Sequence, residues 1–165
     1  MKKRDLLMRV AGAMIFLLIF FAPGVFAKEY QDTVQGFSII YPDGWIVEKS
    51  EIPDIFFVTD PAKFPWLTAG VSKAVDFTAA VQAHMKGWTS GLVLKPIRET
   101  LTQGGTKAFM MEVEYVVRGY DSRGLVLGIQ DGGTWAMAAF STAPPWGQYD
   151  EAEFLKVLKT LKFKK

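Results

Sequence analysis

The chain of 165 residues contains no cysteine and only one histidine. The absence of thiols excludes disulfides, a thiol nucleophile and cysteine-ligated zinc or iron–sulfur centres. A single histidine excludes metal motifs that need two. Disorder is also disfavoured, because aromatic residues make up 14% of the chain and eight prolines are spread along it. The length suits one folded domain.

A long membrane-spanning run is also missing. The longest apolar run, residues 10–22, falls short of the roughly 20 residues that cross a bilayer. Basic residues precede it and the small-residue end Val25-Phe26-Ala27 follows it, an order that predicts a secretory signal peptide over residues 1–27. Cleavage is then expected between Ala27 and Lys28. The alternative is an uncleaved anchor, the one way in which the sequence predicts attachment to a membrane.

Export implies that residues 28–165 work in the periplasm or outside the cell. The signal segment holds four basic and one acidic residue, so its removal takes the net charge from +2 to −1. A near-neutral domain without a basic cluster is a poor nucleic-acid binder. No repeat, linker or low-complexity block divides residues 28–165, which are therefore expected to form a single domain.

Apolar runs and turn signals in the first half predict strands over residues 37–41, 45–49, 55–59 and 67–74. The turn signal Pro42-Asp43-Gly44 predicts that the second strand runs back along the first. A helix over residues 77–90 is expected to begin after Asp76 and to stop at Gly91. Its buried stripe consists of Phe77, Val81, Met85 and Trp88.

The second half is predicted to be a strand meander followed by a helix. The strands cover residues 93–101, 106–118, 125–130 and 134–141, with turns at 103–105, 120–124 and 131–133. Phe109 to Val117 alternate between an apolar face and a face that carries Glu112 and Glu114. Asp150 is expected to cap a last helix over residues 151–161, which buries Phe154, Leu158 and Leu161. Together these strands and helices predict a fold of the α+β class, with an antiparallel β-sheet flanked by helices.

The segment Gly36-Phe37-Ser38-Ile39-Ile40-Tyr41-Pro42-Asp43-Gly44-Trp45 resembles the opening strand and turn of the PsbP/Mog1-like superfamily. The ending Leu161-Lys162-Phe163 also fits, so the resemblance covers roughly residues 30–163. It implies an α/β/α sandwich and a protein that binds or assembles rather than catalyses. The family includes the extrinsic PsbP subunit of photosystem II, the Ran-binding Mog1 protein and exported bacterial proteins. The signal peptide is compatible with the exported group. No functional residue of the family carries over to this chain.

Few residues suggest chemistry. His84 is the only histidine and is expected to be a surface or half-buried structural residue, because no partner motif accompanies it. Glu112 and Glu114 have the spacing of an acid/base pair or a cation site, but a solvated face, or one covered by a helix that supplies Lys or Arg, explains them better. The glycine pairs at 104–105 and 132–133 lack a phosphate-loop pattern and fit hairpin turns. No catalytic residue, metal or cofactor is predicted.

Aromatic residues in or beside two proline-containing loops are the candidate partner surface: Phe64, Trp66, Trp146 and Tyr149. Rigid aromatic side chains bind partners at low entropic cost. The alternative is that these rings fold inward and close the ends of the core.

The predicted function is a non-enzymatic module that binds or stabilises a protein or another component of the cell envelope. Two rivals stay open. One is a small-ligand carrier with a pocket between sheet and helix lined by Met110, Met137 and Phe140. The other is a hydrolase or another enzyme of a type that the motifs do not reveal.

Overall fold

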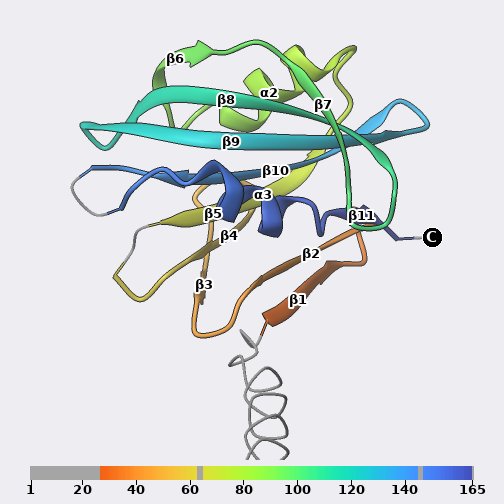
Figure 1. Cartoon of the computed structure of the whole chain (residues 1–165), viewed down its shortest axis with the longest axis horizontal. Helices are drawn as coiled ribbons and strands as arrows, with labels where there is room; N and C mark the ends of the chain where they lie inside the picture. The colour runs from red at the N-terminus through yellow and green to blue at the C-terminus, as the bar shows by residue number, and fades with distance from the viewer. Residues whose placement is uncertain (1–26, 63–64, 145–146, 165) are drawn as a thin grey trace, which may run out of the picture.

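The computed structural model describes residues 27–62, 65–144 and 147–164 (Figure 1). The predicted signal segment up to Phe26 lies outside them. Among the described residues, no helix has the length and apolarity needed to cross a membrane. In chain order the elements are β1 (Ala27–Asp32), β2 (Phe37–Pro42), β3 (Ile46–Glu48), β4 (Phe56–Thr59), β5 (Trp66–Ser72), α2 (Phe77–Met85), β6 (Ser90–Leu94), β7 (Arg98–Leu101), β8 (Lys107–Val117), β9 (Tyr120–Asp131), β10 (Thr134–Thr142), α3 (Glu151–Leu158) and β11 (Lys162–Phe163).

The strands form two antiparallel sheets. The large sheet has the order β3-β4-β5-β10-β9-β8-β6, and β7 also pairs with β8. The small sheet has the order β1-β2-β11. Figure 1 shows α2 on one side of strands β8 to β10, and α3 with the small sheet on the other. We call these the α2 side and the α3 side of the large sheet.

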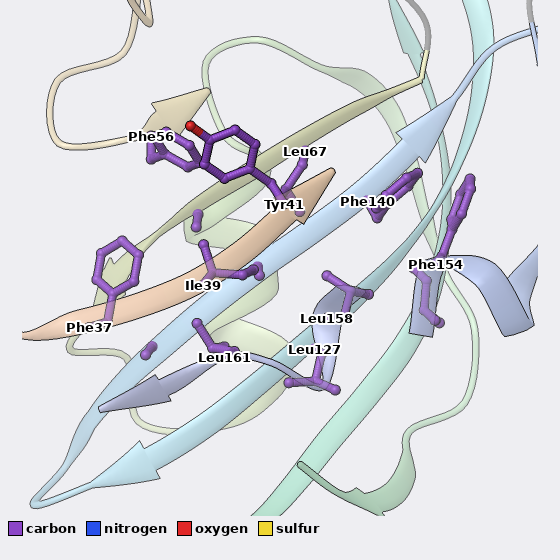
Figure 2. Close-up of a cluster of buried hydrophobic side chains, with 14 of the residues drawn as sticks. Phe37, Ile39, Tyr41, Phe56, Leu67, Leu127, Phe140, Phe154, Leu158 and Leu161 are labelled. Atoms are coloured by element: carbon purple, nitrogen blue, oxygen red, sulfur yellow. The ribbon is translucent and has the colours of Figure 1, made fainter. Parts of the chain in front are cut away.

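Strand alternation divides the buried side chains into two clusters, one on each side of the large sheet. In β10, Trp135, Met137 and Ala139 face α2, whereas Ala136, Ala138 and Phe140 face α3. The α2-side core adds Phe77, Val81 and Met85 from the helix and Met111, Val113 and Tyr115 from β8. The α3-side core, shown in Figure 2, adds Phe37, Ile39 and Tyr41 from β2 and Phe154, Leu158 and Leu161 from the C-terminal segment.

Helix α2 begins as predicted and ends earlier. The carboxylate of Asp76 accepts the N–H of Ala79 at 2.8 Å, which caps the first turn. The helix stops at Met85 instead of continuing to residue 90. Its last carbonyls are satisfied by side chains, because Trp88 donates to the carbonyl of His84 and Thr89 to that of Met85. The stop predicted at Gly91 is therefore wrong, since β6 already begins at Ser90.

The first turn joins two sheets instead of two paired strands. β2 belongs to the small sheet, whereas β3 pairs with β4 in the large sheet, so the predicted pairing of residues 37–41 with 45–49 is wrong. The turn contains Gly44 at φ +84°, a conformation that favours glycine. Strand β1 was not predicted, because its exposed polar residues give no apolar alternation.

The meander differs from the prediction at two places. Residues 93–101 form two strands, β6 and β7, which pair with successive parts of β8. The β8–β9 turn lies at Arg118-Gly119, with φ of +50° and +83°, rather than at residues 120–124. Gly124 instead lies inside β9 opposite Ser141, where a Cβ would come within 2.3 Å of the Ser141 Oγ. The hairpin at residues 131–133 is confirmed.

Helix α3 is capped as predicted, since Asp150 accepts the N–H of Glu153 at 3.1 Å. It ends at Leu158, and β11 then pairs with Phe37 and Ser38 of β2. The predicted α+β class is confirmed in its coarse form, as antiparallel sheets with two short helices.

Candidate functional site

Of the four residues of the predicted aromatic surface, the structure describes Trp66 and Tyr149. Phe64 and Trp146 lie outside the described residues. Trp66 belongs to β5, is 4% exposed and packs in the α2-side core. A contact role for Trp66 is therefore not supported, because its ring closes the core. Tyr149 packs on the α3 side against Phe154, with ring centroids 5.2 Å apart.

Tyr149 lies in a cluster of charged residues on the α3 side. The guanidinium carbon of Arg123 lies 4.2 Å from the centroid of the Tyr149 ring. Arg123 also binds Glu112 at 2.8 Å, and the Glu112 side chain is only 15% exposed. Arg98 of β7 binds Glu151 of α3 at 2.7 Å. We call Arg98, Glu112, Arg123, Tyr149 and Glu151 the Tyr149 cluster; it ties the start of α3 to β7, β8 and β9.

The Tyr149 hydroxyl stays protonated in this cluster. Its oxygen is enclosed beside the Glu112 side chain. Burial raises the pKa of Tyr149, and the negative charges of Glu112 and Glu151 raise it further. The hydroxyl is therefore a neutral group rather than a base or nucleophile at neutral pH.

A pocket of about 710 Å³ adjoins the cluster, between the end of β10 and the start of α3. Three rings contribute to its lining, those of Phe140, Tyr149 and Phe154. The other described lining residues are Pro65, Thr142, Gly147, Gln148, Asp150, Glu151, Ala152 and Glu153. They include three carboxylates and no Lys, Arg or His.

Thr142 and Gly147 meet at one wall of this pocket. Thr142 is 2% exposed, and its Oγ1 has no hydrogen-bond partner. A Cβ at position 147 would come within 2.3 Å of that oxygen, so only glycine fits there without a shift. The Thr142 hydroxyl is therefore buried without a hydrogen-bond partner, whereas buried hydroxyl groups in proteins are normally paired.

A second pocket of about 400 Å³ lies between the β1–β2 turn and β4. Asp32, one of its two carboxylates, accepts the N–H groups of Val34 and Gln35, the Tyr30 hydroxyl and the Gln35 amide. Asp32 thus holds the turn together, and its acceptor positions are used by the protein itself.

The carboxylates predicted on the β8 face are ion-paired. Glu112 pairs with Arg123, and Glu114 with Lys95 at 3.0 Å, so Lys and Arg do reach this face, but the helix predicted to supply them does not. The cations come from β9 and from the segment after β6, not from a helix. Arg123 was missed because its place beside Glu114 follows from the β8–β9 register, which the turn at 118–119 sets.

His84 is structural as predicted, but it lies in the core rather than at the surface or half-buried, because α2 packs it against β5. It is 5% exposed, and its Nε2 lies 2.9 Å from the Thr68 hydroxyl. Burial lowers the pKa of His84 to about 4, so the ring is neutral at physiological pH. Among the described residues, no group of three or more His, Asp or Glu side chains could hold a metal ion.

The residues predicted to line a carrier pocket are not brought together. Met137 faces α2, whereas Phe140 faces α3 and Met110 pairs with Leu127 on the α3 side. Directly paired residues share a face of a sheet, so Met110 and Met137 are separated by the sheet itself. The predicted lining is wrong, and only Phe140 contributes to the 710 Å³ pocket.

No protein-family model and no curated protein matches the chain. Solved structures do resemble it. The solution structure of cyanobacterial PsbP (CyanoP) from Synechocystis sp. PCC 6803 matches with a TM-score of 0.59 and 17% identity, over 87% of this chain and 95% of that one. A crystal structure from Bacteroides thetaiotaomicron VPI-5482 matches with a TM-score of 0.54 and 17% identity, over 84% of this chain and 48% of that one. At this identity the likeness concerns the fold alone. The chain has a PsbP/Mog1-like fold.

Proposed function

We propose that this protein is an exported, non-enzymatic module that binds or helps to assemble a protein or another component of the cell envelope. The observation that carries the proposal is the fold match, which spans 95% of the CyanoP chain. The PsbP/Mog1-like superfamily acts mostly through binding and assembly. In this proposal α2 and α3 are the outer layers of an α/β/α sandwich around the large sheet.

The geometry of the α3 side supports a binding role. Ion pairs from three strands fix the surroundings of Tyr149 before any partner arrives. A surface that is ordered in advance loses less entropy on binding. The groups that catalysis most often uses have structural roles here, since His84 is buried against Thr68 and Glu112 is paired with Arg123.

Partner capture tests the proposal. We would express the full chain with a C-terminal tag in a bacterial host related to its source, crosslink it in living cells and identify captured proteins by mass spectrometry. We expect one reproducible envelope partner, with capture reduced about tenfold in Tyr149→Ala, because loss of a well-packed aromatic contact commonly costs more than 1 kcal/mol. Tyr120→Ala is the matched control, since Tyr120 is the first residue of β9, is 44% exposed and does not belong to the Tyr149 cluster.

The same captured protein reports on export. We expect its intact mass to correspond to a mature chain that begins at Lys28, and we expect this chain in the soluble envelope fraction. Absence of any reproducible partner, or equal capture in both tyrosine variants at unchanged melting temperature, would overturn the proposed binding role at this surface.

A further inference from the structure

Strand β7 forms an edge of the large sheet. It pairs with β8 along one side, and no described strand pairs with its other side. Sheets usually protect such edges with charged side chains, bulges or very short strands. The neighbouring β6 has an irregular register between Ser90 and Val93, whereas β7 pairs with β8 residue by residue. Apolar side chains accompany this regular edge, since Ile97 and Leu101 are 46% and 57% exposed.

The backbone of β7 directs free polar groups to its outer side. Thr102 donates its N–H to the Thr106 carbonyl at 2.9 Å, as the next pair in the β7–β8 register. Because bonded residues alternate in an antiparallel pair, Glu99 and Leu101 direct their N–H and C=O groups away from β8. No described residue forms a hydrogen bond with these outward groups. A further strand could therefore pair with β7 at these two residues.

The end of α3 closes one end of this free edge. Gln103 is the next residue that points outward. It donates its N–H to the Lys159 carbonyl at 2.8 Å and its side-chain amide to the Lys156 carbonyl at 3.4 Å. From residue 103 onwards α3 thus takes the place of an added strand. The two lysines bring positive charge to this point, and no described carboxylate pairs with either of them.

A second copy of the chain fits this edge poorly. Two β7 strands paired about Glu99 would bring two carboxylates side by side, which destabilises a sheet. Pairing about Thr100 would place Ile97 opposite Gln103. That position is already occupied by the Lys159 carbonyl. The edge therefore suits a different chain, one with an extended segment that carries carboxylates where it meets α3.

We propose that β7 binds an extended acidic segment of the protein partner as an added antiparallel strand. The segment pairs with the backbone of Glu99 and Leu101, and its apolar side chains lie against the exposed ones of β7. Its amino-terminal end carries Asp or Glu and reaches the lysines of α3, because an antiparallel strand begins beside the end of β7. Arg98 of β7 belongs to the Tyr149 cluster, so this edge continues the surface of the proposed function. The inference deepens that function and rests on it.

The test uses two capped heptapeptides, acetyl-Asp-Asp-Val-Thr-Val-Thr-Val-amide and a counterpart with two lysines in place of the aspartates. Each is titrated into the ¹⁵N-labelled protein, expressed as the full chain and purified after export. With the acidic peptide we expect saturable shifts of the Glu99 and Leu101 amide signals and slower hydrogen exchange of these two N–H groups. The basic peptide should bind about fivefold more weakly, since it loses two exposed ion pairs.

Substitutions assign the contacts. Leu101→Pro removes an N–H that points away from β8, where sheets tolerate proline, so the melting temperature should change by less than about 4 °C. It should weaken the acidic peptide about tenfold, whereas Leu101→Ala keeps the N–H and should weaken it about threefold. Lys156→Gln with Lys159→Gln should abolish the preference for the acidic peptide. Lys73→Gln with Lys86→Gln, on either side of α2, is the matched control and should leave the preference unchanged.

Equal binding of the two peptides, or no binding of either, would overturn the strand addition at β7. So would unchanged binding to Leu101→Pro; if that variant does not fold, the hydrogen exchange and the lysine variant decide. Protection of Glu99 and Leu101 that rises with protein concentration, without peptide, would assign the edge to a second copy and also overturn the proposal. If wild-type protein and Leu101→Pro capture the same partner equally in cells, the proposed function stands without this edge. If wild-type protein captures none, the proposed function fails as well.

Discussion

The two sides of the large sheet are built differently. On the α2 side, a single helix covers an apolar core that includes the neutral His84. On the α3 side, a helix and a three-stranded sheet share the cover, and next to their core lie the Tyr149 cluster and the larger pocket. The difference is that the α2 side is mainly an apolar core, whereas the α3 side adds ion pairs and a pocket at the edge of its core.

The two helices also approach the sheet differently. Phe77 of α2 lies directly over Gly128 of β9, where a Cβ would come within 2.8 Å of the Phe77 ring. On the α3 side, Phe154 packs against the ring of Phe140 instead, with the two ring planes tilted by 33° (Figure 2). Close contact with backbone leaves little room for adjustment, whereas contact between side chains permits repacking.

The largest expected effect comes from removing the main ring of each helix. Phe77→Ala and Phe154→Ala should each lower the free energy of unfolding by about 4 kcal/mol, because both rings are almost fully buried. Urea titration followed by circular dichroism measures this change. Phe→Leu at each position is the milder control. A loss below about 1 kcal/mol for Phe154→Ala alone would mean that the small sheet holds the α3 side without its helix.

Sequence periodicity predicted much of both cores and little of the site. The stripe of α2, the alternation in β8 and the caps at Asp76 and Asp150 follow from local spacing, and the structure contains them. The pairing of Arg123 with Glu112 depends on the β8–β9 register, and the contact of Arg98 with Glu151 joins segments that lie 53 residues apart. Such contacts depend on tertiary packing, which periodicity does not encode.

Which residues are buried also depends on strand pairing that local sequence does not encode. Trp66 looked like a loop residue beside Pro65, but its register opposite Ser141 places it inside the sheet. Strand β1 has almost no apolar pattern and owes its place to pairing with β2. What local sequence leaves undetermined is therefore mostly which strands are neighbours, and this choice also places the pocket.

Acid should weaken the α2 side through His84. The folded-state pKa is about 4 and the unfolded value about 6.5, so the unfolded chain binds the proton more tightly. The stabilisation from the neutral ring is complete above pH 6.5 and is lost as the pH falls towards 4. We expect a loss of about 3 kcal/mol over this range, measured by urea titration at several pH values.

His84→Gln isolates that contribution, because glutamine can keep a hydrogen bond to Thr68 but does not titrate. The variant should lose less stability than the wild type between pH 6.5 and 4. Identical pH profiles for the two proteins would show that carboxylates, rather than His84, dominate the loss of stability in acid. His84 would then not distinguish the α2 side from the α3 side.

The smallest expected effect is the loss of stability when the ion pair of the Tyr149 cluster is removed. It tests whether this ion pair fixes the cluster before a partner binds. Arg123→Gln leaves the largely buried Glu112 without its cation and uncovers the Tyr149 ring, so the free energy of unfolding should fall by about 1.5 kcal/mol. Arg118→Gln is the control. Its partner Glu51 and Arg118 itself are 87% and 80% exposed, and no measurable change is expected there. A double-mutant cycle with Glu112→Gln should give a coupling energy near 1 kcal/mol. A coupling of zero would mean that the ion pair adds nothing to the fold, and that Tyr149 is held by the rings of the α3-side core alone.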